Sequence, residues 1–263
     1  MTAMRSLVGK VYLVGAGPGA PDLLTLRGAA VLERAEVVFY DALVHPDIVQ
    51  LAYRARKVAV GKRAGRLSTD QRFINRALVE AGLRHANVVR LKGGDPMLFG
   101  RAQEEIAALE AAGVEVEVVP GVTTALAAAA TLRRSLTRRA VSRSVTFATA
   151  RVGQGEADGG WARAVAAADT AILYMALGEA EKIQRELLGQ GLDSATPVVI
   201  VENASLPTEH HRSGTLATLS ALAQANFQGP AIVCVGEVFR AASQASATPV
   251  FPEEEGAARA GAP

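Results

Sequence analysis

The sequence of 263 residues has little cysteine, few aromatic residues and almost no net charge. Its single cysteine, Cys234, excludes a disulfide or a multi-cysteine zinc site within one chain. Because Cys234 lies in the apolar run 231–235, we expect a small buried hydrophobic side chain rather than a reactive thiol. No window holds the roughly 18 uninterrupted apolar residues of a membrane span, and the N-terminus lacks the apolar segment of a signal peptide. We therefore expect a soluble, cytoplasmic protein that binds no membrane.

The charge balance argues against binding to nucleic acid. There are 28 basic and 26 acidic residues, a net charge of +2, which is too even for recognition by bulk electrostatics. Arginine is nevertheless dense between residues 133 and 143, and a local basic surface suits an anionic small molecule. The pair His210-His211 suggests a metal only weakly, because neighbours on a strand point to opposite faces and no third His or Cys is near. We predict no metal site.

Apolar runs of strand length alternate with amphipathic stretches of helix length. Helical patterns cover 24–34, 70–81 and 103–112, and an alanine-rich one follows Pro120-Gly121 to about Leu132. The alternation predicts an α/β protein with two α/β domains, whose sheets are mainly parallel or mixed and whose active-site cleft lies between them. We place an N-terminal domain at 1–121, a C-terminal domain at 122–240 and a disordered tail at 241–263. The predicted strands are 10–14, 37–40, 57–60, 87–91, 114–119, 144–149, 170–175, 197–202 and 231–236.

Two glycine-rich loops follow predicted strands. The loop from Arg90 to Arg101, RLKGGDPMLFGR, combines adjacent glycines with charged residues, which is typical of a binding site where backbone approaches a polar ligand. The loop 15–20, GAGPGA, fits the loose dinucleotide fingerprint, and Asp41 stands where a ribose-binding acid would lie. Against a nicotinamide cofactor, Pro18 and the residues after it lengthen the loop, so helix amides do not follow the glycines directly. Gly-Pro-Gly after a strand is also an ordinary turn signal.

Motifs along most of the chain resemble a known family. The segment 14–19, followed by PDLLTL at 21–26, is similar to the opening motif of the tetrapyrrole methylases, which use S-adenosylmethionine. YDALV at 40–44, GKRAG at 61–65, the Arg90–Arg101 loop and VPGVT at 119–123 resemble the uroporphyrinogen-III C-methyltransferases within that superfamily. LTRR at 136–139, YM at 174–175, VEN at 201–203 and GPA at 229–231 extend the resemblance over about residues 8 to 240.

The resemblance implies a methyltransferase that holds S-adenosylmethionine between its two domains. The implied reaction methylates C2 and C7 of uroporphyrinogen III, a polycarboxylate, to give precorrin-2 by way of precorrin-1, and the implied assembly is a homodimer. Asp41 matches the proposed base and Lys62 the proposed proton donor, although Asp41 could also cap a turn and Lys62 could pair with a substrate carboxylate. Basic candidates for the substrate carboxylates are Arg63, Arg66, Arg101, Arg138 and Arg139. The implied cofactor-binding residues are Pro18, Gly93, Gly94, Asp95, Leu98, Thr123, Thr124, Met175, Ala204, Pro230 and Ala231.

Three alternatives stay open at this level. Another methylase of the corrin ring would share the first glycine loop, but the KRAG motif argues against it. An NAD-dependent oxidoreductase rests on that loop and Asp41, and a noncatalytic tetrapyrrole carrier would fold without binding the methyl donor. The chain also departs from the usual pattern of the family at Arg138, Ala150-Arg151, Ala204 and Glu209, which bears on affinity and substrate preference rather than on the fold.

Overall fold

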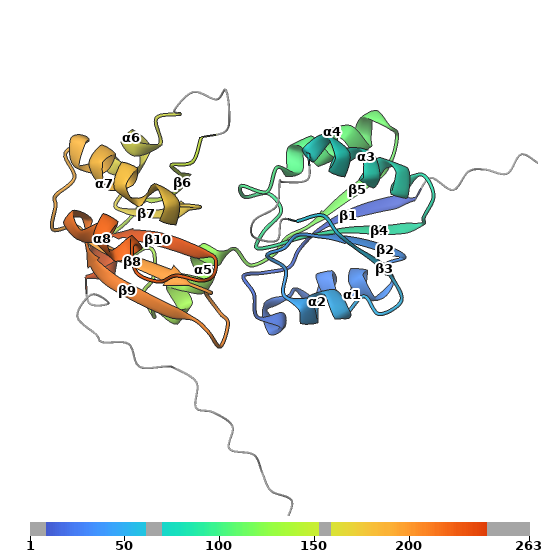
Figure 1. Cartoon of the computed structure of the whole chain (residues 1–263), viewed down its shortest axis with the longest axis horizontal. Helices are drawn as coiled ribbons and strands as arrows, with labels where there is room; N and C mark the ends of the chain where they lie inside the picture. Colours follow the sequence, from blue (N-terminus) through green and yellow to red (C-terminus); the bar gives the residue numbers. More distant parts are fainter. Residues whose placement is uncertain (1–8, 62–69, 153–158, 241–263) are drawn as a thin grey trace, which may run out of the picture.

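The computed structural model describes residues 9–61, 70–152 and 159–240, which form two β-sheets with helices on both faces of each (Figure 1). The first sheet is parallel throughout, in the order β3-β2-β4-β1-β5. Its central strands are buried on both faces, which is why they are near-continuous apolar runs in the sequence. The strands are β1 (Lys10–Gly15), β2 (Val37–Tyr40), β3 (Arg56–Ala59), β4 (Asn87–Lys92) and β5 (Glu115–Val119).

Helices on the two faces of this sheet bury separate apolar clusters. On one face α1 (Leu26–Glu33) and α2 (Pro46–Gln50) pack on the side chains of Val38 and Leu91, among others. On the other face α3 (Gln71–Gly82) and α4 (Ala102–Ala111) pack on alternate strand residues such as Val37 and Val88. Local signals set the helix starts, since Thr25 Oγ1 accepts from Gly28 N at 3.1 Å before α1 and Asp70 Oδ1 accepts from Arg72 N at 2.9 Å before α3.

The second sheet is mixed. In the order β6-β7-β10-β8-β9, only β6 and β7 run parallel, and the other neighbours are antiparallel. One face is covered by α6 (Trp161–Ala166), α7 (Ala180–Gly189) and α8 (Leu219–Ala223), and the opposite face by α5 (Thr124–Thr131) and a 3-10 helix at Glu237–Phe239. The strands are β6 (Val145–Thr149), β7 (Thr170–Tyr174), β8 (Pro197–Glu202), β9 (His210–Thr215) and β10 (Ala231–Gly236).

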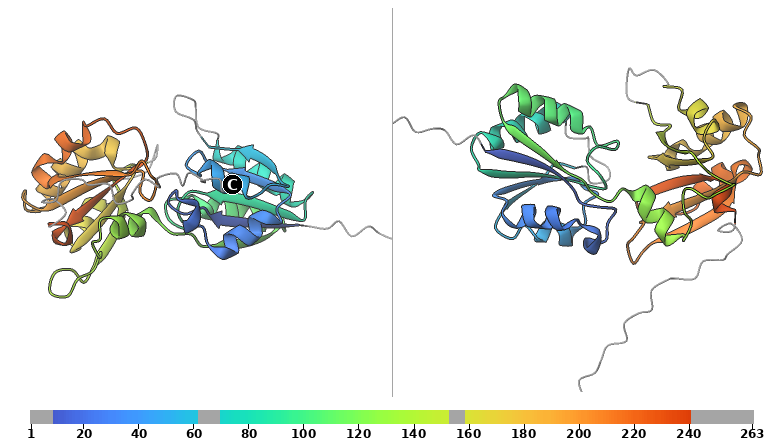
Figure 2. Two further views of the ribbon diagram at one scale, coloured as in Figure 1. Left: turned by 90° about the horizontal axis from the view of Figure 1, so that it is seen from below. Right: turned by 180° about the vertical axis from the view of Figure 1, so that it is seen from behind.

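The two sheets lie at opposite ends of the molecule, joined by the segment between β5 and α5 (Figures 1 and 2). The predicted α/β class with two sheets is confirmed, and the predicted strands fall within about two residues of those observed. The division at residues 121 and 122 stays a prediction, and the predicted tail 241–263 lies outside the described residues. Cys234 is fully buried in the second sheet, as expected, and burial raises the pKa of its thiol to about 12.

Candidate functional site

A cavity of about 620 Å³ lies where the ends of strands from both sheets face each other. From the first sheet, its lining follows the carboxyl ends of β1, β2, β4 and β5. From the second sheet, residues after β6, β7 and β8 and residues at the start of β10 contribute. Because β10 is antiparallel to β7 and β8, its first residues lie at the same edge as their last ones. Ligands in α/β proteins characteristically bind at this edge of a sheet.

Four glycines allow the strand-end loops of the first sheet to pack backbone against backbone. A Cβ atom on Gly121 would lie 2.4 Å from the carbonyl oxygen of Gly94, and one on Gly15 would lie 2.6 Å from the backbone of Gly121. Gly17 and Gly94 exchange backbone hydrogen bonds of 3.2 and 2.7 Å, and Ala16 N donates to Lys92 O at 2.7 Å. The glycines of the two loops therefore bind each other and together form one wall of the cavity.

Asp95 joins two of these loops. Its Oδ2 accepts from Gly121 N at 2.9 Å, and its Oδ1 accepts from Met97 N at 2.8 Å. Gly94 beside it has a φ of +67°, and a Cβ at that position would meet no atom within 4 Å. Gly94 lines the cavity, so a side chain there would occupy space that backbone alone leaves for a ligand.

Backbone strain concentrates around the cavity. Phe99 and Met175, two of its lining residues, have φ of +53°, in the left-handed region that non-glycine residues rarely adopt. Arg101, Asn203 and Ser205 in the adjoining loops also have positive φ. Such conformations cost about 1–3 kcal/mol each and persist where the surrounding structure enforces them, most often at binding sites.

Tyr174 connects the walls contributed by the two sheets. Its hydroxyl lies 2.5 Å from Thr123 Oγ1 and accepts from Ala125 N at 3.1 Å, and its ring packs on Phe99 with a centroid distance of 5.1 Å. Burial raises the pKa of Tyr174, so the hydroxyl stays protonated. A second bridge between the two halves runs from Ala20 N to Ser205 Oγ at 3.1 Å.

A buried ionic network supports Asp41, which lines the cavity directly after β2. Arg90 Nη2 donates to Asp41 Oδ1 at 2.7 Å and Arg90 Nε to Glu105 Oε1 at 3.0 Å, while Lys92 Nζ donates to Glu105 Oε2 at 3.0 Å. Arg90 and Lys92 are each 3% exposed, and Glu105 is completely buried. Two cations and two carboxylates thus form a paired cluster, the arrangement in which buried charge is tolerated.

The network shifts the pKa values of its cations in opposite directions. Burial alone lowers the pKa of Arg90, but the carboxylates of Asp41 and Glu105 outweigh it and raise the value above the ordinary one. For Lys92, burial and the repulsion from Arg90 outweigh the attraction of Glu105 and Asp41 and lower its pKa. Lys92 is also a lining residue of the cavity, which places a lysine with a reduced proton affinity beside the site.

The structure brings together most of the residues that the sequence singled out. Asp41 lines the cavity, together with all the residues implied to bind the cofactor: Pro18, Gly93, Gly94, Asp95, Leu98, Thr123, Thr124, Met175, Ala204, Pro230 and Ala231. Arg101 does not line it and forms a bidentate pair with Glu104 on the surface, at 2.7 Å for both contacts. Lys62, Arg63 and Arg66 lie outside the described residues. The roles of these residues stay predictions.

Several residues at or directly behind the cavity wall were given no role from the sequence. The period-2 pattern of β4 places Arg90 and Lys92 on the face that α4 covers, and Glu105 is an acid on that helix, so a charged pair across this interface could have been expected. Tyr174 was noticed only as part of a motif. Leu43, Phe99 and Arg151 lie in segments that the sequence singled out, but they were assigned no role, because the convergence of these distant loops on one cavity has no local signal.

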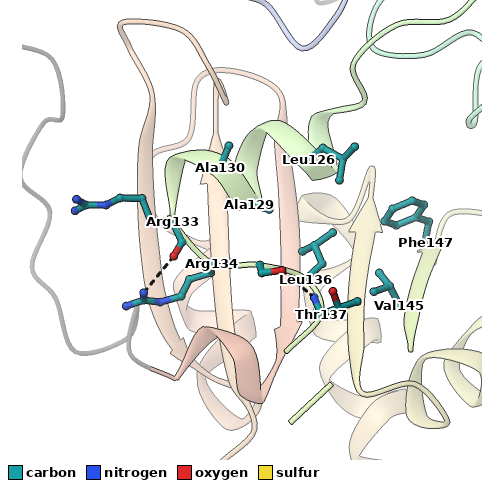
Figure 3. A pocket seen from close by; sticks show the side chains of 10 residues that line it. Leu126, Ala129, Ala130, Arg133, Arg134, Leu136, Thr137, Val145 and Phe147 are labelled. Carbon is teal, nitrogen blue, oxygen red and sulfur yellow. Dashed lines mark hydrogen bonds between the residues drawn. The ribbon is translucent and has the colours of Figure 1, made fainter. Parts of the chain in front are cut away.

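A second cavity, of about 540 Å³, lies beside α5 on the second half of the chain (Figure 3). Its walls are mainly apolar, and the side chain of Arg133 points away from it in Figure 3. Arg138 and Arg139 are exposed residues of the neighbouring turn, in which Arg138 pairs with Ser142, and they do not line the first cavity. The structure therefore separates these two predicted substrate ligands from Asp41 within one chain. The lining comprises Leu126, Ala129, Ala130, Arg133, Arg134, Ser135, Leu136, Thr137, Val145 and Phe147.

Comparison with known proteins agrees with the observed fold. The family of Tetrapyrrole (Corrin/Porphyrin) Methylases matches residues 10–220. The chain belongs to this family. A uroporphyrinogen-III C-methyltransferase of Synechocystis sp. is 43% identical over 238 residues, which cover 89% of this chain and 90% of that protein. The crystal structure of uroporphyrin-III C-methyl transferase from Thermus thermophilus complexed with S-adenyl homocysteine superposes with a TM-score of 0.78 at 40% identity, covering 89% of this chain and 100% of that one.

Other relatives of this methylase are longer proteins. A siroheme synthase of Psychrobacter sp. is 43% identical over 233 residues, which are 88% of this chain but 48% of that protein. The chain therefore spans about half the length of the siroheme synthases it matches. Within the described ranges, no helix combines the length and apolar character needed to cross a membrane.

Proposed function

We propose that this methylase transfers methyl groups from S-adenosylmethionine to C2 and C7 of uroporphyrinogen III, giving precorrin-2 by way of precorrin-1. The observation that carries the proposal is the cavity between the two sheets, which gathers Asp41 and every residue that the resemblance assigns to the methyl donor. The similarity to the Thermus protein complexed with S-adenyl homocysteine, the demethylated product of this donor, supports the same ligand here.

The residues of the cavity fit such a donor. The Gly93-Gly94 segment exposes backbone where a side chain would fill the space, and Leu98 and Met175 offer apolar surface for an adenine ring. When bound, the donor would supply a methyl group on a sulfonium sulfur, so that in-line attack by a substrate carbon on the methyl carbon would break the carbon–sulfur bond and release the neutral thioether. The enclosing loops hold donor and acceptor in this alignment and keep water away.

Asp41 is the group that we assign to proton removal. Methylation of a pyrrole carbon leaves positive charge on the ring, and loss of a ring proton to a carboxylate discharges it. Asp41 lies at the cavity wall, 28% of its side chain is exposed, and Arg90 holds its Oδ1. The basic residues that we propose for the substrate carboxylates are Arg101 of the neighbouring loop together with Arg63, Arg66, Arg138 and Arg139.

The structure disfavours the NAD-dependent alternative. The amides of Ala16 and Gly17, which would have to cradle a pyrophosphate, donate instead to carbonyl oxygens of the second glycine loop. Helix α1 begins only at Leu26, after a 3-10 turn at Pro21–Leu23, so its free amides do not follow the glycines. Asp41 is paired with Arg90 rather than presented to a ribose.

The decisive experiment is anaerobic incubation with uroporphyrinogen III and labelled S-adenosylmethionine, with the products followed by mass. Addition of two methyl groups is the expected result. Donor binding without transfer would indicate another tetrapyrrole methylase or a noncatalytic carrier, and thermal protection by NAD instead of by the donor would restore the oxidoreductase alternative.

Asp41→Ala tests the assignment of the base. We expect S-adenosylhomocysteine to bind with its wild-type Kd, because Asp41 belongs to the substrate side of the proposal, while turnover falls by about 10²- to 10⁴-fold, the usual contribution of a general base. Wild-type turnover in this variant would remove Asp41 from that role.

We further propose that the methylase is a cytoplasmic homodimer that uses the face around the second cavity. Leu126 and Phe147 at this cavity are 54% and 38% exposed, and contact with a second copy of the chain would bury this apolar surface. Sedimentation at several concentrations tests this. Leu126→Glu should yield monomer, and a wild-type monomer at all concentrations would contradict the proposal.

A further inference from the structure

The feature that carries a further inference is the arginine behind Asp41. All three guanidinium nitrogens of Arg90 donate hydrogen bonds: Nε to Glu105 Oε1, Nη1 to Leu91 O at 3.2 Å and Nη2 to Asp41 Oδ1. The side chain is 3% exposed, so it is fixed by packing as well as by its partners. A planar guanidinium with this set of contacts presents one nitrogen to Asp41 in a single orientation.

The anchor behind Arg90 is equally well defined. Glu105 accepts from Arg90, from Lys92 and from Gln71 Nε2, the last at 3.2 Å, and has no exposed surface. Gln71 in turn donates to Asn75 Oδ1 at 2.9 Å, which ties the network to α3. The groups around Arg90 thus come from the end of β2 and from β4, α3 and α4, and the two carboxylates balance the charges of Arg90 and Lys92.

The pairing leaves Asp41 able to react. One hydrogen bond to Oδ1 uses one of the roughly four lone-pair positions of a carboxylate. Arg90 remains a cation at every relevant pH, since the network raises its already high pKa, so it cannot take the proton from Asp41. Its contribution to the reaction can therefore only be to orient the carboxylate and to set its charge environment.

We propose that Arg90 is a positioning residue that holds the Asp41 carboxylate at the cavity wall, and that Glu105 fixes Arg90 for this role. The inference rests on the proposed function of Asp41 as the base. It separates two kinds of arginine in this protein: exposed ones that suit substrate carboxylates, and a buried one that reaches the reaction only through Asp41.

A double-mutant cycle tests this coupling. Arg90→Met should lower kcat by about 10- to 100-fold, the loss expected when a reacting group is displaced by about 1 Å, while the Kd of S-adenosylhomocysteine changes by less than about 3-fold. In an Asp41→Asn background, adding Arg90→Met should lower kcat by less than a further factor of about 3, because the side chain that Arg90 positions is no longer a base. Full additivity of the two losses would overturn the proposal.

Conservative and control variants separate positioning from stability. Arg90→Lys keeps the charge but cannot bridge two carboxylates with a planar fork, so we expect wild-type cofactor affinity with kcat restored only in part. Lys10→Met is the matched control, since Lys10 also bridges two carboxylates, Glu115 at 2.7 Å and Glu117 at 2.8 Å, at the opposite end of the same sheet. It should leave kcat unchanged, and an equal fall in both variants would indicate a structural effect alone.

A readout without turnover keeps this test independent of the substrate. In ¹⁵N spectra of the wild-type protein, the Arg90 guanidinium should give a protected Nε–H signal and separate Nη signals, because rotation of a doubly paired group is hindered. Asp41→Asn and Glu105→Gln should each restore rotation. Averaged Nη signals in the wild-type protein would refute the fixed pair, whereas failure of the wild-type protein to methylate uroporphyrinogen III would refute only the proposed function.

Discussion

Gly121→Ala offers the sharpest test of how the cavity wall is built. The added Cβ would lie 2.4 Å from Gly94 O and 2.8 Å from Gly15 Cα, whereas ordinary contacts begin near 3.4 Å. The neighbouring atoms are backbone and cannot rotate away, so the strand-end loops must separate by about 1.0 Å. That movement would stretch the hydrogen bond of 2.9 Å from Gly121 N to Asp95 Oδ2.

The expected effects follow from this displacement. Overpacking of this kind costs about 1–3 kcal/mol, and a shift of about 1 Å at a binding wall can reduce turnover by about 100-fold. We expect weaker S-adenosylhomocysteine binding in calorimetry, together with a fall in Tm of several degrees, at roughly 2–4 °C for each kcal/mol.

Gly189→Ala is the matched control for the same substitution. Gly189 ends α7, its Cβ would meet no atom within 4 Å, and its φ is not positive, so alanine should be neutral or stabilise by about 0.5–1 kcal/mol. If Gly121→Ala bound S-adenosylhomocysteine with the wild-type Kd and kept the wild-type Tm, the backbone-on-backbone account of the cavity wall would be wrong.

Three further predictions concern buried polar groups. Glu105→Gln leaves two buried cations facing each other and should lower the free energy of unfolding by about 3–5 kcal/mol in urea titrations. The exposed control Glu115→Gln should lower it by less than about 1 kcal/mol. Equal losses in the two variants would contradict a stabilising role for the buried network. Tyr174→Phe removes the partner of Thr123 Oγ1 and Ala125 N and should destabilise by about 1–3 kcal/mol, and an unchanged Tm would show that water replaces the hydroxyl. Native Cys234 should not react with a thiol reagent at pH 8, whereas the unfolded chain should react once. Because burial raises the pKa of the folded thiol to about 12, its contribution to the free energy of unfolding is fully present below about pH 8.5 and should be lost as the pH rises toward 12. Cys234→Ala should not show this pH dependence.

The sequence predicted the parts of the fold whose residues carry a one-dimensional pattern. Strands β1, β2 and β4 are buried on both faces, so their apolar runs mark them clearly. Strand β9, with the sequence HHRSGT, is a polar edge strand, and its pairing with β8 has no such signature. Helix α7 was not predicted, although Ile183 and Leu187 stand one helical turn apart and are both buried.

The candidate site likewise has residues that the sequence could identify and contacts that only the packing reveals. Residues such as Pro18, Asp95 and Thr123 were singled out because motifs resemble those of a family, and the structure places them at one cavity. A charged pair between β4 and α4 could have been expected from the period-2 pattern, but which atoms of Arg90 and Glu105 meet depends on how α4 crosses β4, which no motif states. That Arg138 and Arg139 lie away from Asp41 likewise follows from the packing of the second half of the chain.

Unfavourable features of this protein gather at one cavity, although the left-handed residues Arg133 and Ala140 lie elsewhere, and this gathering argues for function independently of any resemblance. Buried Arg90, Lys92 and Glu105 and the left-handed residues Phe99 and Met175 all lie at or directly behind the wall of one cavity. Apolar residues at the buried positions would give a core of equal or greater stability, and ordinary turns would avoid the strain. A fold that retains both beside the same cavity is best explained by a ligand that requires a rigid, charged wall. The coupling of Arg90 to Asp41 is the part of this explanation that a single cycle of variants can refute.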